Sequence, residues 1–206
     1  MSDQQERECV LSSKLIAHCS FLTASFYINF LLTISSAIVE AKRRITPAGA
    51  SVHVRYRLFA DHIDGTYAAV DGTHAHLNVP ATFAWAPSLP DTPIRVRFTQ
   101  PPGRSWRVST QLFTTDDPLA FTAPNLQYLM DSPAEFGPVS MREFTVNDRR
   151  FRIAMHHQGS DADLDAFAKD VEQIVRQEGA VYGEFPQYEP GSYTFLTDLL
   201  PWANGD

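Results

Sequence analysis

Between residues 51 and 157, hydrophobic and polar side chains alternate along the chain in a series of short runs. A period of two residues is typical of β strands with one buried and one solvated face. Turn-forming proline, glycine and aspartate residues separate the runs. The spacing predicts a mainly β domain, with an antiparallel, sandwich-like arrangement. The alternation is clearest in residues 52–58, 74–79, 94–99, 106–110, 139–146 and 149–155.

The period changes after residue 158. Apolar residues then recur at helical spacing, at Leu164, Phe167, Val171, Ile174 and Val175. Ser160 is suited to cap the start of this helix, and Gly179 or Gly183 to end it. An apolar, strand-like run follows over residues 193–200. We therefore expect a β-domain over residues 45–158 and the first helix and strand of an α/β domain over residues 159–206.

The N-terminal segment, residues 1–44, has a different character. Residues 15–39 contain no charged side chain. As a helix of 25 residues they would extend about 37 Å, enough to cross a hydrocarbon layer of about 30 Å. The segment is therefore a candidate membrane span. Basic residues 42–44 follow it, so a span would leave the downstream domain in the cytoplasm.

Other interpretations of residues 15–39 stay open at this stage. The same residues would suit a buried helix or two strands of the β-domain, because Phe, Tyr, Ile and Thr favour strands. A start site or sequence join that does not represent the natural protein is a further interpretation. Without a membrane span we expect a cytoplasmic location.

Composition narrows the class of protein. The chain has 206 residues, of which 44% are hydrophobic and 20% charged, as expected of a folded globular protein. The formal net charge is −7, so a basic surface for nucleic acid is not expected and we predict no nucleic-acid partner.

The sequence contains neither of two common motifs for metal binding and nucleophilic catalysis. No histidine is followed by glutamate, so the helical zinc motif His-Glu-x-x-His is absent, as is Gly-x-Ser-x-Gly. His74 and His76 would face the same side of a strand, which can begin a metal site. The sequence suggests no third ligand nearby, so side chains on the solvated face of the sheet are the more common interpretation. His156 and His157 would face opposite sides. We therefore predict no metal site and no catalytic residue in this chain.

Glu135 is the candidate substrate-binding residue. It follows a turn at Asp131-Ser132-Pro133 and has apolar neighbours, so it is a candidate for a partly buried carboxylate. At the rim of a cleft, such a group could hold the free amino group of a peptide. The alternative is a solvated or helix-capping glutamate, which is the more common environment of this residue type.

Several stretches in order resemble the glycyl aminopeptidase family of zinc metallopeptidases. These are residues 54–60 (VRYRLFA), 73–78 (THAHLN), 106–112 (WRVSTQL), 131–137 (DSPAEFG) and 193–196 (YTFL). The resemblance covers roughly residues 45–206. It implies an N-terminal β-domain followed by a thermolysin-like catalytic domain, often with a PDZ domain beyond.

The resemblance also implies which parts are missing. In the family the zinc helix and its third glutamate ligand come after the strand that resembles residues 193–200, and this chain has neither. We therefore expect an N-terminal fragment that shapes the substrate cleft and is inactive alone, with zinc and a peptide substrate only in a full-length relative. The alternative is a non-enzymatic peptide- or protein-binding β module, with a membrane anchor if residues 15–39 span a bilayer.

Overall fold

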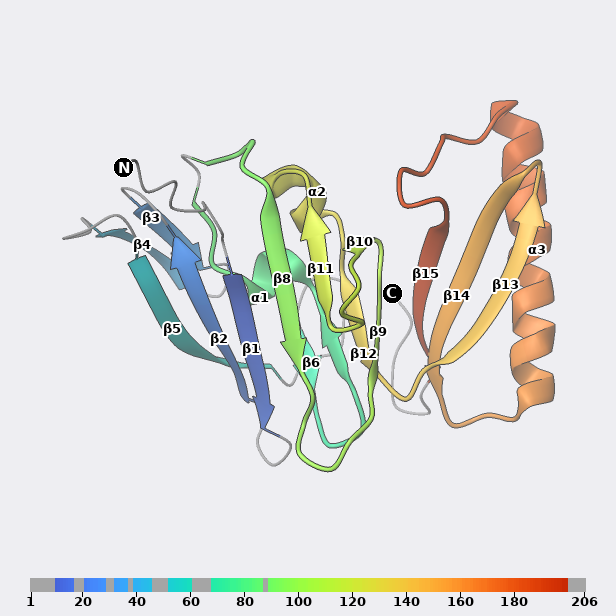
Figure 1. Ribbon diagram of the computed structural model, residues 1–206. Helices are drawn as coiled ribbons and strands as arrows, with labels where there is room; N and C mark the ends of the chain where they lie inside the picture. Colours follow the sequence, from blue (N-terminus) through green and yellow to red (C-terminus); the bar gives the residue numbers. More distant parts are fainter. Residues whose placement is uncertain are drawn as a thin grey trace.

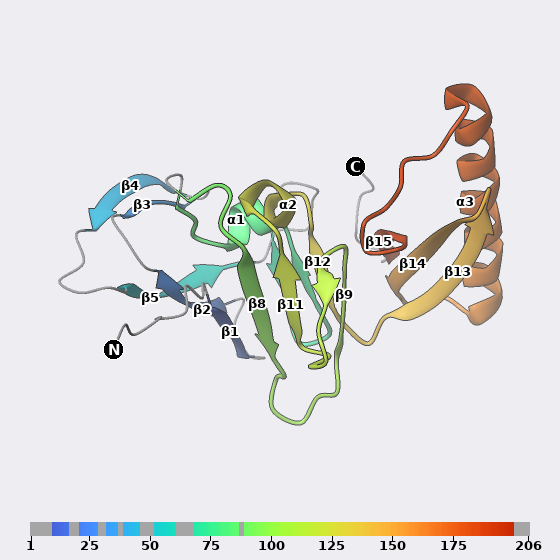
Figure 2. The same cartoon turned by 45° about the horizontal axis from the view of Figure 1, so that its top comes forward.

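The computed structural model shows a large β part followed by a smaller sheet that is covered by one long helix (Figure 1). A view turned by 45° shows the same two parts, with the helix on the outer side of the smaller sheet (Figure 2). The structure describes residues 10–16, 21–28, 32–36, 39–45, 52–60, 68–86 and 89–199.

A six-stranded sheet forms one layer of the β part, in the order β10-β11-β8-β1-β2-β5. Its neighbouring strands are antiparallel except for β1 and β8, which run parallel. A parallel pair at this point departs from the expected antiparallel arrangement. The strands are β1 (Val10–Ile16), β2 (Phe21–Ile28), β5 (Val52–Phe59), β8 (Ile94–Thr99), β10 (Phe113–Thr114) and β11 (Ala120–Ala123).

A second, four-stranded antiparallel sheet has the order β6-β7-β12-β9. Its strands are β6 (Ala69–Val70), β7 (Ala75–Leu77), β12 (Ala134–Gly137) and β9 (Arg107–Thr110). The β part also has a two-stranded ribbon and two short helices. These are β3 (Leu32–Ser36), β4 (Val39–Ile45), α1 (Val79–Thr82) and α2 (Leu126–Met130).

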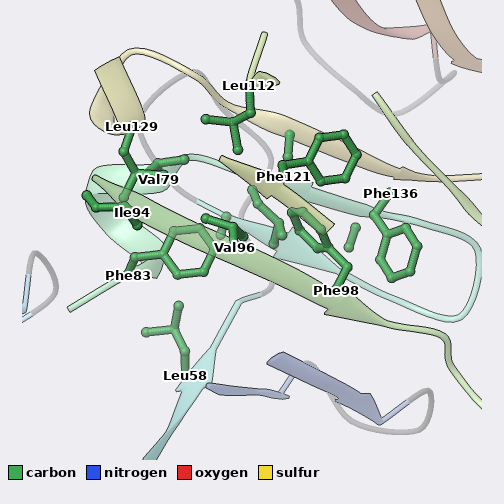
Figure 3. Close-up of a cluster of buried hydrophobic side chains, with 14 of the residues drawn as sticks. Leu58, Val79, Phe83, Ile94, Val96, Phe98, Leu112, Phe121, Leu129 and Phe136 are labelled. Atoms are coloured by element: carbon green, nitrogen blue, oxygen red, sulfur yellow. The ribbon is translucent and has the colours of Figure 1, made fainter. Parts of the chain in front are cut away.

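The main core lies between these two sheets. In β8 the apolar residues Ile94, Val96 and Phe98 are buried and the arginines between them are exposed, as the alternation predicts. The ring of Phe98 contacts Phe136 of β12, with centroids 5.6 Å apart, and Phe121 of β11 (Figure 3). This contact between sheets gives the sandwich-like, mainly β fold. Burying each phenylalanine contributes about 1.5–3 kcal/mol.

The segment proposed as a membrane span forms strands in the parts that the structure describes. β2 and β3 fall within residues 15–39, and β2 pairs along its whole length with β5. Among the described residues, no helix combines the length and hydropathy needed to cross a bilayer. A short apolar run rich in aromatic and β-branched residues is compatible with a helix or with a strand. Here its pairing with β5 stabilises the strand. Residues 1–9, 17–20, 29–31 and 37–38 lie outside the described part of the chain.

The C-terminal part contains the predicted helix and strand. Its sheet has the order β13-β14-β15, and β14 runs parallel to β15 with α3 as the crossover. Ser160 caps α3 in a reciprocal capping box with Asp163, and Gly183 ends the helix at φ 85°. The elements are β13 (Ser140–Val146), β14 (Arg149–His157), α3 (Asp161–Tyr182) and β15 (Tyr193–Leu199). Residues 200–206 of the predicted unit lie outside the described range.

The β13–β14 hairpin belongs to this sheet and not to the preceding sandwich. The prediction had placed it within the β-domain of residues 45–158, whereas the change of sheet falls between β12 and β13. The physical reason is that one helix and one strand cannot bury their apolar faces alone. The hairpin supplies Phe151 against Val175, and Ile153 and Met155 against Leu164.

The turn of the β13–β14 hairpin allows the fold to be tested by substitution. Val146 pairs with Arg149, and the two residues between them, Asn147 and Asp148, have φ of 47° and 60°. This geometry is that of a two-residue turn in which glycine is favoured. We expect Asp148→Gly to raise the free energy of unfolding by up to about 1 kcal/mol, measured by urea denaturation.

A matched substitution separates the turn from a general effect of glycine. Asp170 is exposed in the interior of α3, where the backbone is helical. Asp170→Gly should lower the free energy of unfolding by roughly 0.5–1 kcal/mol. Destabilisation by both substitutions would contradict the turn assignment.

Candidate functional site

A cluster of buried and half-buried polar side chains lies where the β part meets the C-terminal sheet. It contains three imidazoles and two carboxylates. His76 lies in β7 and Glu135 in β12, while His156 lies in β14 and Asp198 in β15. His74 precedes β7 directly. We call these five residues the junction cluster.

Strand register creates the cluster, because each sheet places one histidine beside one carboxylate. Glu135 lies opposite His76 in the antiparallel β7–β12 pair, and His76 Nδ1 is 3.1 Å from Glu135 Oε2. Asp198 lies beside His156 in the parallel β14–β15 pair, and His156 Nδ1 is 3.2 Å from Asp198 Oδ1. Side chains at paired positions point to the same face of a sheet, so each contact follows from the pairing.

His74 joins the two pairs. Its ring stacks on that of His156, with centroids 3.8 Å apart and an interplanar angle of 22°. Its Nε2 lies 3.6 Å from Asp198 Oδ1, and His76 Nδ1 lies 3.8 Å from Asp198 Oδ2. Asp198 is therefore close to all three imidazoles.

The turn before β7 holds His74 in position. Asp71 Oδ1 accepts hydrogen bonds from the backbone N–H groups of Thr73 and His74, at 2.6 and 3.0 Å. The same oxygen is 3.4 Å from His74 Nδ1, and Thr73 Oγ1 is 3.2 Å from that nitrogen. On the other side, the backbone of Gly137 approaches so closely that a Cβ there would lie 2.9 Å from His74 Cβ.

Two atoms of the cluster are buried without a hydrogen-bond partner among the described residues. They are His74 Nε2 and Glu135 Oε1. Both residues have 0% exposed surface. A buried polar atom without a partner costs about 1–3 kcal/mol, and more when it is charged, so these two atoms require a functional explanation.

Burial and mutual charge shift the ionisation of the cluster. Burial raises the pKa of Glu135 to about 7, although the hydrogen bond with His76 opposes this. Burial, followed by the nearby His156, lowers the pKa of His74. The bond to Asp198 raises the pKa of His156. Burial acts to raise the pKa of Asp198, but the bond from His156 and the neighbouring imidazoles hold it below its usual value. For His76, burial is outweighed by Glu135 and Asp198, and its pKa is raised.

The sequence anticipated part of this arrangement. His74 and His76 both face Asp198, as expected for residues two apart near a strand, but His74 is completely buried and does not lie on a solvated face. His157 turns away from the cluster, because its Nε2 is 2.9 Å from Ser140 Oγ and its Nδ1 is 3.1 Å from the Gly159 carbonyl oxygen. Glu135 was expected to be partly buried and is completely enclosed.

The residues of the cluster that the sequence did not suggest as metal ligands, His156 and Asp198, come from the C-terminal sheet. One donor atom each from His74, Glu135, His156 and Asp198 lies within 4.8 Å of the others, a grouping that could hold a metal ion. Asp198 was missed altogether. Its signal is a single acidic residue within the otherwise uncharged run of residues 193–200, a position where a charge is costly unless it has partners.

Comparisons with known proteins show what the sequence and the fold are similar to. The model of the peptidase M61 N-terminal domain matches residues 38–138. These residues include β5 to β12 and therefore the sandwich core and Glu135. Residues 38–138 are thus similar to an N-terminal region of the M61, or glycyl aminopeptidase, type, in agreement with the resemblance seen in the sequence. A search of the curated proteins gave no match.

A solved structure shows the same fold over nearly the whole chain. It is an aminopeptidase N family protein from Idiomarina loihiensis, with a TM-score of 0.75, 18% sequence identity and 92% of the present chain covered. The present chain spans 38% of the length of that protein. The match extends the likeness in fold to the C-terminal sheet, beyond the residues that the family model covers.

Glu135 should make stability depend on pH in a characteristic direction. Its pKa is about 7 in the folded protein, against an ordinary value of 4.5. The folded state therefore binds its proton more tightly, and this contribution to stability is lost as pH rises from about 4.5 through 7. Relative to Glu135→Gln, the wild type should lose about 3 kcal/mol of unfolding free energy between about pH 4 and pH 8.

The measurement is urea denaturation across this pH range in a buffer that contains a chelator. Glu178→Gln, in an exposed position on α3, is the control and should follow the wild type. Parallel pH profiles for the wild type and Glu135→Gln would show that Glu135 is not held in the buried, protonated form.

Gly137 provides a second test of the site. A methyl group at this position would meet the Cα and Cβ of His74, which belong to a turn held by Asp71. We expect Gly137→Ala to lower the free energy of unfolding by about 1–3 kcal/mol. Gly72, where an added Cβ meets nothing within 4 Å, is the control. Equal effects of alanine at both positions would contradict the close approach.

Proposed function

We propose that this chain is the N-terminal part of a zinc-dependent aminopeptidase, in which it forms one wall of the substrate cleft. The match of residues 38–138 to the peptidase M61 N-terminal domain carries this proposal. The fold shared with an aminopeptidase N family protein supports it, because the likeness covers 92% of this chain. The substrate class would be peptides with a free amino terminus.

The peptidase zinc of the family has no matching ligands in this sequence. No histidine is followed by glutamate, and α3, the long helix of the C-terminal part, contains no histidine. A metal-activated water and its general base are the groups that such hydrolysis requires. We therefore assign no step of peptide cleavage to these residues, and we propose that the 206-residue chain alone is inactive.

Glu135 is the proposed contact for the substrate's amino group. Its Oε1 atom has no hydrogen-bond partner within the described part of the chain, while Oε2 faces His76, so one carboxylate oxygen is left to accept hydrogen bonds from an ammonium group. The side chain is completely buried between the β part and the C-terminal sheet. Because Glu135 is completely buried, an amino group could reach it only after a local opening between the β part and the C-terminal sheet. The wall-forming role is therefore better supported than direct contact.

A non-enzymatic peptide-binding module is the second hypothesis, with an extended peptide added to the free edge of β15. A hydrogen-bonded edge is the usual requirement for this mode. However, the amide of Gln111 already occupies the beginning of that edge, since it donates to the Ser192 carbonyl oxygen at 2.6 Å and accepts from Thr194 N–H at 3.0 Å. This contact favours the peptidase proposal over the peptide-binding module.

The substrate role of Glu135 can be tested in a full-length relative of known activity. Substitution of the aligned glutamate by glutamine should lower kcat/KM at least tenfold for a peptide with a free amino terminus, because the glutamine is uncharged. Cleavage of the same peptide with an acetylated amino terminus is the control and should change little. Equal losses for the two peptides would assign the residue a structural role instead.

The proposed inactivity has a direct test. The purified 206-residue chain should not cleave fluorogenic aminoacyl substrates, with or without added Zn²⁺. Turnover that a chelator abolishes, and that persists through successive purification steps, would overturn this part of the proposal.

A further inference from the structure

We propose that His74, Glu135, His156 and Asp198 bind one divalent transition-metal ion, at a site separate from the peptidase zinc of the family. The ion would join the β-domain, which supplies His74 and Glu135, to the C-terminal sheet, which supplies His156 and Asp198. We take Zn²⁺ as the representative ion.

The donor set and its spacing suit such an ion. One donor atom from each of the four residues lies within 4.8 Å of the other three. Zinc binds nitrogen and carboxylate oxygen at about 2.0–2.2 Å in tetrahedral geometry, which places ligand atoms about 3.4 Å apart. The four donor atoms would therefore have to move closer together by about 1 Å to bind the ion, which side-chain rotations can achieve without a change of fold. Two imidazoles with two carboxylates favour zinc and its neighbours over calcium or magnesium.

The two unpartnered atoms of the cluster support the proposal independently of this spacing. His74 Nε2 and Glu135 Oε1 are completely buried, and neither has a hydrogen-bond partner among the described residues. They belong to two of the four proposed ligands. A cation between them would satisfy both atoms at once, whereas no described residue donates a hydrogen bond to the carboxylate oxygen.

The surrounding residues orient the ligands as in known metal sites. A metal-binding histidine usually places its second ring nitrogen against a carboxylate or carbonyl group. His74 Nδ1 has Asp71 Oδ1 at 3.4 Å and Thr73 Oγ1 at 3.2 Å, which leaves Nε2 for the metal. His76 lies within 3.1 Å of Glu135 Oε2 and 3.8 Å of Asp198 Oδ2. It would hold the second oxygen of each ligating carboxylate.

Charge balance points the same way. Two ionised carboxylates and a divalent ion are neutral together, and buried charges are costly unless they are balanced in this way. His74 Nε2 is buried without a hydrogen-bond partner among the described residues, so this nitrogen is available to a metal. This inference does not depend on the proposed function, although a metal ion and a substrate amino group would compete for Glu135 Oε1.

The experiment uses the whole purified chain, with any affinity tag removed and the metal stripped by a chelator. Zn²⁺ binding is measured by calorimetry, and Co²⁺ binding by visible absorption, which reports tetrahedral coordination. We expect one equivalent to bind and Zn²⁺ to raise Tm. His74→Gln and Asp198→Asn should each weaken Zn²⁺ binding at least 100-fold, and His76→Gln about 10–100-fold, as for an outer-sphere partner.

His157→Gln is the matched control, because His157 is adjacent to His156 in sequence but bonds to Ser140 and Gly159. It should bind Zn²⁺ as the wild type does. Circular dichroism checks the fold of each variant, and Glu135→Gln, which preserves side-chain size, replaces any variant that does not fold. The proposal is overturned by the absence of saturable binding at millimolar Zn²⁺, or by unchanged affinity in the folded ligand variants. No peptide is present, so the result is independent of the substrate proposal.

Discussion

The register of two strand pairs is the constraint on which the junction depends. Pairing of β7 with β12 places His76 beside Glu135, and pairing of β14 with β15 places His156 beside Asp198. A slip of one residue in either pair would turn one member to the opposite face. Four side chains from distant parts of the sequence thus meet because hydrophobic faces on both sides set the pairing. The core residues Phe136 and Ile153, on the same strands, stabilise that register.

The local features of the fold were largely predictable from the sequence. Alternation in residues 94–99 predicted β8, and the spacing of apolar residues after Ser160 predicted α3 with its cap. The sheet to which the β13–β14 hairpin belongs was not predictable in the same way. Alternation shows that a strand has two different faces, but it does not identify the strand's partner. Here the need to bury Phe151 and Ile153 against α3 decides the partner.

The candidate site was predictable only in fragments. Glu135 and the pair His74 and His76 could be recognised from residue type and spacing. His156 and Asp198 lie 42 residues apart and join the others through tertiary contact. A charged residue within an apolar strand is the feature that sequence reasoning can use, because such a residue is costly unless it has partners. Asp198 is such a residue, and its partners are three histidines.

The amide of Gln111 has a further consequence for the behaviour of this chain. By bonding to Ser192 and Thr194, it takes the place that a neighbouring strand would occupy at the start of β15. Open sheet edges promote association between copies of a protein. A second chain that added to β15 would first have to displace this side chain and leave its polar atoms unpaired. Gln111 therefore hinders the addition of a strand at the start of β15. The same two hydrogen bonds link the β part to the C-terminal sheet.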